Sequence, residues 1–290
     1  MASRGKSINM FLMDGRVSGP IKCTLANWTG VCFKIPRTSL DFCKDRKELK
    51  QTGVYFLFGK DEQSDKNVVY IGQASVRKNG EGILNRLCEH KRNPNKGYWT
   101  EAIAITTSND SLGPTEISYL EHTFCKLANE AKRYVVKNGN DPNIGNLSEE
   151  KQSEMEDFID YAKVIIGALG HKVFESLVEE NQNNESGVTL YCKRSNTDAT
   201  GVQTSDGFVV RKGSKISPTP TPSCPDYALN KRKQHQDIIG DDFILKEDIL
   251  FNTPSGAASF VCGASANGYV EWKDSNGTSL KNMNIGGGAD

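Results

Sequence analysis

The 290-residue sequence has no excess of charge of either sign, because 36 lysines and arginines balance 36 aspartates and glutamates. A neutral chain has no overall attraction to a polyanion, so such a partner has to be recognised by a local surface. The sequence also has no long apolar run, and its start, MASRGKSINMFLMDG, predicts neither a signal peptide nor a membrane span. We therefore expect no membrane partner.

Cysteine is present but is not spaced for metal binding. None of the eight cysteines forms a CxxC pair, which argues against a zinc ribbon and against a thioredoxin-like motif. Cys88 and Cys125 lie in apolar segments with helical spacing, where a free thiol packs as a small hydrophobic group. Free thiols and the lack of a signal peptide together favour a reducing cytoplasm.

The charge is balanced overall but distributed unevenly. Residues 77–96 hold six basic residues against two acidic ones, and residues 149–160 hold six acidic residues against Lys151. A local basic surface can bind a phosphate backbone. Charge alone favours the alternative, in which both segments are solvated helix surface.

The first 50 residues predict a small β-rich unit. Three short apolar segments are separated by turn residues, and a helical pattern follows Pro36. The expected elements are strands over 7–12, 21–25 and 31–35 and a helix over 39–49.

Residues 51–178 predict the main domain. Two apolar segments rich in β-branched and aromatic residues form a long-looped hairpin, and helical patterns alternate with one further strand. The expected elements are strands over 53–58, 68–71 and 102–106 and helices over 82–92, 114–131 and 148–168. This order predicts an α+β fold with a central antiparallel sheet of about three strands flanked by helices.

The remaining sequence predicts a second, mixed domain. Residues 179–187 are polar and aperiodic, as in a linker, and residues 188–283 form the C-terminal domain with strands near 188–192 and 207–210. Residues 284–290 are glycine-rich and predict a disordered tail.

One helical segment carries a candidate pair of functional side chains. Arg86 and His90 are four positions apart, so a helix places both on one face, which Ile83 and Leu87 turn inward. Phosphodiester cleavage needs groups of this kind to bind charge and to move protons. Spacing alone favours the alternative, a surface arginine beside a partly buried histidine.

Two tyrosines and two glutamates are further candidates. Tyr55 and Tyr70 lie on the two strands of the hairpin, where a phenol can orient water or bind a phosphate oxygen, although most such tyrosines belong to the core. Glu116 and Glu121 lie at opposite edges of the apolar stripe of the helix over 114–131. Periodicity does not decide which of the two is a metal ligand.

These residues follow the order of a known signature. Gly53-Val54-Tyr55 followed by Tyr70-Ile71-Gly72 resembles the GIY-YIG motif, with Arg86 and Glu121 at the family's order and approximate spacing. The segment Arg86-Leu87-Cys88-Glu89-His90 resembles the Arg-x-x-x-His arrangement of restriction-type members. The resemblance covers residues 53 to about 140.

The resemblance implies a role for each matching residue. Glu121 would bind Mg²⁺ or Mn²⁺, Tyr55 would position or activate the attacking water, and Arg86 would bind the scissile phosphate with Tyr70. His90 would assist proton transfer or phosphate contact. The family often has an asparagine after the metal helix, and both Asn138 and Asn140 are candidates for this position, with Asn138 taken as the site residue.

The flanking segments resemble the longer bacterial GIY-YIG proteins. Residues 206–214 and 253–273 are similar to a domain associated with restriction enzymes and adenine methylases. That similarity and the basic segment Lys231-Arg232-Lys233 suggest DNA reading by the C-terminal domain, with a folding or dimerisation module as the alternative.

We therefore expect a cytoplasmic bacterial hydrolase, a divalent-metal-dependent endonuclease that cuts DNA in restriction, phage defence or mobile-element biology. The residues do not distinguish DNA from RNA as the partner, and they leave a homodimer open. The alternative function is a catalytically silent nucleic-acid-binding protein on the same fold. A protein-interaction scaffold is a third interpretation, which does not explain the basic segment over 77–96.

Overall fold

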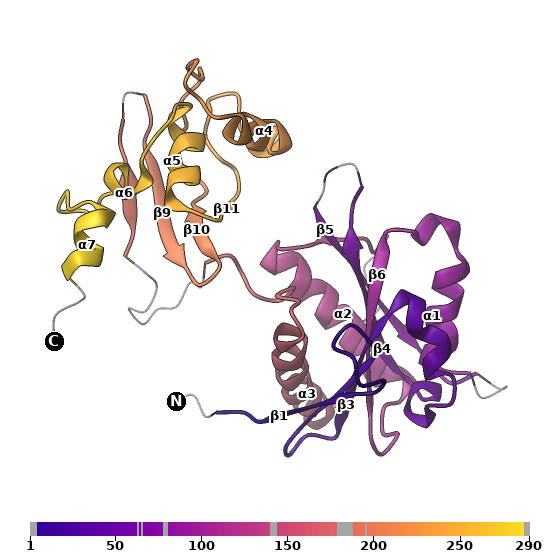
Figure 1. Ribbon diagram of the computed structural model, residues 1–290. Coiled ribbons are helices and arrows are strands. Elements are labelled where there is room, and N and C mark those ends of the chain that lie inside the picture. Colours follow the sequence, from indigo (N-terminus) through magenta and orange to yellow (C-terminus); the bar gives the residue numbers. More distant parts are fainter. Residues whose placement is uncertain are drawn as a thin grey trace. The chain divides into compact units, whose positions relative to one another are not determined.

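The protein folds into two compact units, Met1–Ser176 and Leu177–Asp290, as seen in a computed structural model (Figure 1). Each unit has a hydrophobic core of its own. The described residues are 5–62, 64, 66–77, 81–139, 144–178, 188–194 and 196–286. The predicted linker over 179–187 lies outside them.

The first unit is built on one seven-stranded sheet. Its strand order is β1-β2-β3-β6-β4-β5-β7, and every neighbouring pair is antiparallel except β5 and β7. The strands are β1 (Ile8–Leu12), β2 (Ile21–Leu25), β3 (Gly30–Pro36), β4 (Gly53–Lys60), β5 (Asn67–Ala74), β6 (Trp99–Thr107) and β7 (Val135–Val136).

The prediction of a separate N-terminal unit beside a sheet of about three strands is wrong. Strand β3 pairs with β6 along its whole length, from Gly30 opposite Thr107 to Pro36 opposite Glu101. Strands β1, β2 and β3 therefore belong to the same sheet as the strands of the predicted main domain. Turn residues in the sequence specify which neighbouring strands form hairpins, but they carry no information about a pairing between strands some 70 residues apart.

The predicted helix over 39–49 is also wrong. The segment forms two short 3₁₀ helices, η1 (Arg37–Cys43) and η2 (Lys47–Lys50), which bury Leu40, Cys43 and Leu49 against the sheet. Short 3₁₀ pieces are common as connectors, and they can produce the same apolar spacing as one α-helix.

Helices cover both faces of this sheet (Figure 1). Helix α1 (Ile83–Arg92) packs with η1 and η2 on the face that carries Tyr55 and Leu57. Helices α2 (Pro114–Ala131) and α3 (Glu149–Ala168) pack on the opposite face, with Val54 and Phe56. The three α-helices agree with the sequence predictions.

The ends of α2 and α3 follow ordinary capping rules. Pro114 occupies the first turn of α2, where its missing N–H costs nothing, and Lys132 ends the helix in the left-handed conformation at φ 54°. Ser148 caps α3 by accepting a hydrogen bond from the Lys151 N–H. These signals fix where the two helices begin and end.

The second unit has a four-stranded sheet in the order β11-β10-β9-β8, again antiparallel. Strands β8 (Leu190–Cys192) and β10 (Gly207–Val210) match the predictions, whereas the other elements had not been predicted. These are β9 (Ala199–Thr204), β11 (Ile249–Phe251), α4 (Asp226–Gln234), α5 (Pro254–Cys262), α6 (Gly268–Glu271) and α7 (Leu280–Gly286), with the 3₁₀ helix η4 (Gln236–Ile238).

The predicted disordered tail over 284–290 is wrong for its first part. Helix α7 continues to Gly286, and residues 287–290 lie outside the described part of the chain. Leu280, at the start of α7, is buried in the core of the second unit, which explains why this segment is ordered despite its glycines.

Arg232, in the predicted phosphate-binding segment, is an internal structural residue. Its Nε and Nη2 donate to the carbonyl of Phe260 at 2.9 and 2.6 Å, and its Nη1 donates to the carbonyl of Ser217 at 2.7 Å. The last carbonyls of a helix have no partner within it, so Arg232 satisfies the end of α5. Lys231 is also partly buried, over the ring of Phe251. This segment therefore does not present three free cations to DNA.

Replacing Arg232 should destabilise the second unit. We expect Arg232→Met to lower the free energy of unfolding by about 2–4 kcal/mol, because carbonyls at the end of α5 lose a charged donor in a partly buried place. The exposed neighbour Lys233 provides the matched control, and Lys233→Met should change stability by less than about 0.5 kcal/mol. Urea unfolding followed by circular dichroism measures both, and equal stability of the two variants would contradict this role.

Candidate active site

The two predicted tyrosines lie on adjacent strands and face α1. Tyr55 on β4 is directly opposite Gly72 on β5, and Leu57 is opposite Tyr70, so all four residues are on one face of the sheet. A Cβ at residue 72 would collide with the Tyr55 hydroxyl. The glycine of Tyr70-Ile71-Gly72 therefore makes room for the ring of Tyr55.

Helix α1 brings His90 onto the same two tyrosines. The Tyr55 Oη and the His90 Nε2 are 2.7 Å apart, a hydrogen-bond distance, and His90 is only 4% exposed. The ring centres of Tyr55 and Tyr70 lie 5.4 and 5.3 Å from that of His90. The three rings form one cluster between β4, β5 and α1.

Burial holds this cluster in its neutral form at physiological pH. Desolvation raises the pKa of Tyr55 far above its ordinary value, and it also raises the pKa of Tyr70, with the Glu121 carboxylate adding to the shift of Tyr70. Desolvation, followed by the charges of Lys96 and Arg86, lowers the pKa of His90 to about 4. A neutral imidazole with one free nitrogen can accept a proton.

Arg86 extends from α1 beside the tyrosines and is half exposed. Its Nη1 is 2.7 Å from Glu89 Oε2, and the hydrogen bond to Glu89 is the main cause of its raised pKa. Glu89 also binds Arg77, at 2.6 Å, and these two arginines lower its pKa to about 2. Arg86 interacts with the Tyr55 hydroxyl as well.

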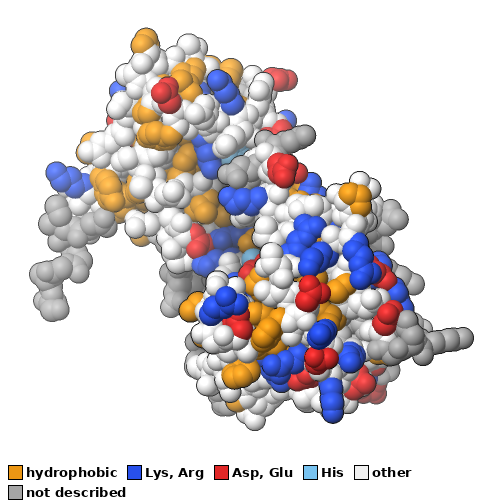
Figure 2. Space-filling view, turned by 45° about the vertical axis from the view of Figure 1, so that its right-hand side comes forward, with side chains coloured by type: hydrophobic (Ala, Val, Ile, Leu, Met, Phe, Trp, Pro, Cys, Tyr) orange, Lys and Arg blue, Asp and Glu red, His pale blue; other side chains and the backbone are white. Residues whose placement is uncertain are grey.

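The predicted basic surface over 77–96 is thus partly neutralised. Glu89 lies between Arg77 and Arg86, and Lys91 is 3.6 Å from Asp41. Figure 2 shows lysine and arginine side chains interspersed with aspartate and glutamate on the visible surface. The described residues of this segment therefore do not form one large basic patch.

Glu121 lies on α2, which packs on the other face of the sheet, and it acts on the cluster through its charge. Its side chain is 9% exposed, and desolvation raises its pKa, opposed by a hydrogen bond from Gln73 and by the charge of Arg86. Its negative charge contributes to the raised pKa of both Tyr55 and Tyr70. Glu116 instead lies in the first turn of α2, against Gly113. The structure therefore separates the two glutamates that periodicity left equivalent.

The side-chain amide of Asn138 hydrogen-bonds the backbone of Ile71, the residue that follows Tyr70 on β5. Its Oδ1 accepts from the N–H of Ile71 at 3.1 Å, and its Nδ2 donates to the carbonyl of the same residue at 2.7 Å. Asn138 therefore continues the pairing of β7 with β5 and positions the strand that carries Tyr70. The other candidate, Asn140, lies outside the described residues.

Sequence reasoning missed three neighbours of the cluster. Gln73 hydrogen-bonds Glu121 and contacts Ser118 Oγ at 3.3 Å, and Glu89 binds Arg86. The ammonium of Lys96 lies 3.2 Å from the ring centre of Tyr70. Gln73 follows the second tripeptide directly and could have been considered, whereas no pattern in the sequence indicates Lys96.

Glu121 is the residue expected to bind a divalent metal ion, and the side chains around it decide whether such an ion fits. In the described part of the chain, no three His, Cys, Asp or Glu side chains gather as a metal cluster. Mg²⁺ commonly binds one or two carboxylates and keeps several water ligands, so a single carboxylate is sufficient. Glu121 forms no ion pair within the described residues, although the charge of Arg86 acts on it, and its buried carboxylate is a suitable ligand for a cation. The residues fit Mg²⁺ or Mn²⁺.

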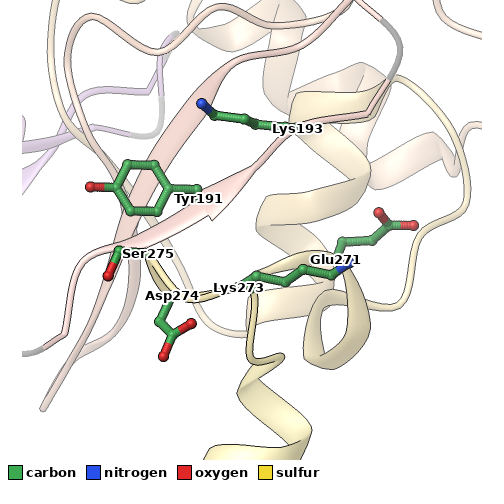
Figure 3. Close-up of a pocket in the computed structure, with 7 residues that line it drawn as sticks. Tyr191, Lys193, Glu271, Lys273, Asp274 and Ser275 are labelled. Carbon is green, nitrogen blue, oxygen red and sulfur yellow. The ribbon is translucent and has the colours of Figure 1, made fainter.

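The second unit contains a separate pocket of about 450 Å³ (Figure 3). Tyr191 and Lys193 extend from one strand segment, and Lys273 belongs to the segment whose backbone pairs with Tyr191. Of the two acidic lining residues, Glu271 is bound by Arg194 at 3.1 Å, and Asp274 Oδ1 accepts two backbone N–H groups of its own turn. The pocket therefore combines an aromatic ring with two lysines, of which Lys193 lies 3.7 Å from Asp198 at the exposed surface.

Protonation of His90 should control stability in acid. The pKa of His90 is about 4 in the folded protein and about 6.5 when unfolded, so the unfolded chain takes up the proton first as pH falls. The contribution of His90 is complete above pH 6.5 and is lost towards pH 4, by up to roughly 3 kcal/mol. His90→Gln cannot titrate, so its free energy of unfolding should fall less between pH 7 and pH 4.5. Parallel urea-unfolding curves for the two proteins across this range would contradict the assignment.

Comparison with known proteins locates one family. Residues 190–284 match the family described as "Domain of unknown function (DUF4357)", which covers the sheet and helices of the second unit up to α7. No curated protein and no solved structure matches the chain. Within the described residues, no helix is both long and apolar enough to cross a membrane. The second unit is thus similar to a recognised domain, and the first unit has to be interpreted from its site.

Proposed function

We propose that the first unit is a GIY-YIG-type nuclease that hydrolyses phosphodiester bonds in DNA with one divalent metal ion. The observation that supports this most is that four residues from separate parts of the sequence meet at one place and that a fifth acts on them through its charge. Tyr55, Tyr70, Arg86 and His90 meet on the α1 face of the sheet, and the charge of Glu121 reaches them from α2. They are the residues that the resemblance assigns to catalysis.

In this proposal Arg86 binds the scissile phosphate and Tyr70 supports it. The guanidinium stays charged over the whole physiological range, because its pKa is raised, and it is half exposed. A fixed positive charge at this place stabilises the negative charge that develops on the phosphate oxygens. The Tyr70 hydroxyl, which remains protonated, can donate a hydrogen bond to the same group.

Tyr55 and His90 act as a proton relay in this proposal. With its Nε2 unprotonated, neutral His90 accepts the hydrogen bond of the Tyr55 hydroxyl. As that proton moves to His90, the Tyr55 oxygen becomes able to take a proton from the attacking water. The two proton transfers occur together, so that no free phenolate forms, because the pKa of Tyr55 is far above neutral and that of His90 is about 4.

Glu121 would hold the metal ion, with Gln73 orienting its carboxylate. When bound, the ion would supply positive charge to the phosphate and its leaving oxygen. The alternative is a catalytically silent DNA-binding protein. The buried Glu121, which forms no ion pair within the described residues, favours the nuclease, since a binding protein gains nothing from a carboxylate near the DNA phosphates.

The first test is metal-dependent cleavage. Purified protein should nick or cut plasmid DNA with Mg²⁺ or Mn²⁺ and should be inactive in EDTA. Glu121→Gln and Arg86→Ala should each reduce the rate on the order of 10²–10³-fold or more with unchanged circular dichroism. Glu121→Gln should still bind DNA, because it removes a negative charge.

Glu116→Gln is the matched control on the same helix, because Glu116 lies at the start of α2, away from the tyrosines. It should retain most of the activity. Equal cleavage in EDTA, or loss of activity in Glu116→Gln with Glu121→Gln active, overturns the proposal. Substrate assays with single-stranded DNA and RNA define the strand preference.

We further propose that the second unit contributes to DNA binding through the pocket of Tyr191, Lys193 and Lys273. An aromatic ring can stack on a base, and lysines can neutralise phosphates. This replaces the basic segment around Arg232 as the basis for DNA engagement, since that arginine is used internally.

The salt dependence of binding tests this second role. Each neutralised phosphate contributes about −0.9 to the slope of log affinity against log salt on duplex DNA, so loss of both lysines should make the slope shallower by up to about 1.8. Full-length protein with Lys193→Met and Lys273→Met should show this change by fluorescence anisotropy, whereas Lys233→Met should not. Identical slopes, with a change of sedimentation mass instead, would assign the unit to dimerisation.

A further inference from the structure

Lys96 lies at a defined place beside the candidate active site. It is the last residue of a short 3₁₀ helix, η3 (Pro94–Lys96), between α1 and β6. The side chain of Asn93 caps this turn by accepting from the Asn95 N–H at 3.0 Å. The turn directs the Lys96 ammonium onto Tyr70, 3.2 Å from the ring centre, and the residue is partly buried.

The ammonium of Lys96 has no acidic partner. No carboxylate forms an ion pair with it anywhere in the described chain, and its close contact is with the face of Tyr70. The neighbouring charge that acts on it is Arg86, which has the same sign. Arg86 is compensated by Glu89 at 2.7 Å, whereas Lys96 is not.

Two cations held together in a partly desolvated place are unfavourable by themselves. Desolvation, and then the charge of Arg86, lowers the pKa of Lys96 to about 8. An anion bound between Lys96 and Arg86 would offset both the desolvation of the Lys96 ammonium and its repulsion by Arg86. Contact with the ring holds the ammonium in place before any ligand arrives, which reduces the side-chain entropy that binding would cost.

We propose that Lys96 is a second phosphate-binding residue of this site, which contacts the same DNA phosphate as Arg86. This inference rests on the proposed function and deepens it. Arg86 provides the permanent charge, and Lys96 provides a charge that depends on pH. The phosphate is thereby bound by two cations.

The pH range follows from the groups around Lys96. Arg86 and His90 face it from α1, Tyr70 from β5, and Tyr98 stands two residues further along the chain. The pKa of His90 is about 4, the pKa of Tyr98 is raised to about 12, and those of Tyr70 and Arg86 are also raised. Lys96 is therefore the group of this set that changes charge between pH 7 and 9.5. Bound phosphate raises its pKa, so affinity should fall from about pH 8 upwards.

The experiment measures binding of a fluorescein-labelled DNA duplex by fluorescence anisotropy, with full-length protein in EDTA at pH 6.5, 7.5, 8.5 and 9.5. Wild-type affinity should fall by roughly tenfold between pH 7.5 and 9.5, the value expected for one charged hydrogen bond. Lys96→Met should bind roughly tenfold more weakly at pH 6.5 and show little further loss. Lys96→Arg should keep its affinity at pH 9.5, because guanidinium does not titrate there.

Lys91→Met is the matched control, because Lys91 is also at the end of α1 but lies beside Asp41 at the surface. It should retain the wild-type pH dependence. If Lys96→Met fails to fold, the DNA affinities of wild type and of Lys96→Arg across the pH series still test the proposal. Equal affinities and equal pH profiles of wild type and Lys96→Met overturn the proposal.

Cleavage assays with Mg²⁺ separate this inference from the proposed nuclease activity. If the wild type never cleaves DNA but the Lys96 variants show the expected changes in DNA affinity, the phosphate-binding role of Lys96 is supported and the nuclease function is wrong. If the wild type cleaves DNA and Lys96→Met binds and cleaves it equally well, the nuclease function is supported and the proposed role of Lys96 is wrong.

Discussion

The hydrogen bond between Tyr55 and His90 is the contact on which the first unit's site depends. It connects the sheet to α1 inside a cluster from which water is largely excluded. Its geometry requires Tyr55 to lie flat against β5, and this is possible because Gly72 has no side chain. Once α1 is docked in this way, Arg86, one turn before His90, is carried to the edge of the same cluster.

Charge in the site is arranged around this neutral centre. The rings of Tyr55, Tyr70 and His90 are uncharged near neutral pH, and ionic groups surround them. Glu89 compensates Arg86, whereas Lys96 and Glu121 lack an ion-pair partner in the described chain. Because one of these two is a cation and the other an anion, a phosphate and a metal ion together would complete the arrangement.

The sequence contained enough information to predict the elements that carry the candidate residues, because these elements have strong local patterns. The hairpin of β4 and β5 and the helices α1 and α2 were predicted from periodicity, and the register of a hairpin places Tyr55 near Gly72. The size of the sheet could not be predicted, since the pairing of β3 with β6 joins distant segments. Lys96 and Arg232 could not be assigned either, because their roles depend on tertiary contacts that no local pattern encodes.

The contact of Asn138 with Ile71 has a consequence for how the strand β5 is held. Strand β7 is only two residues long, so beyond it the edge of β5 would present free backbone groups. The Asn138 amide occupies both polar groups of Ile71, which closes this position to pairing with a strand of another molecule. It also fixes the register of β5, because a slip by one residue would move Tyr70 to the α2 face and bring Ile71 against His90.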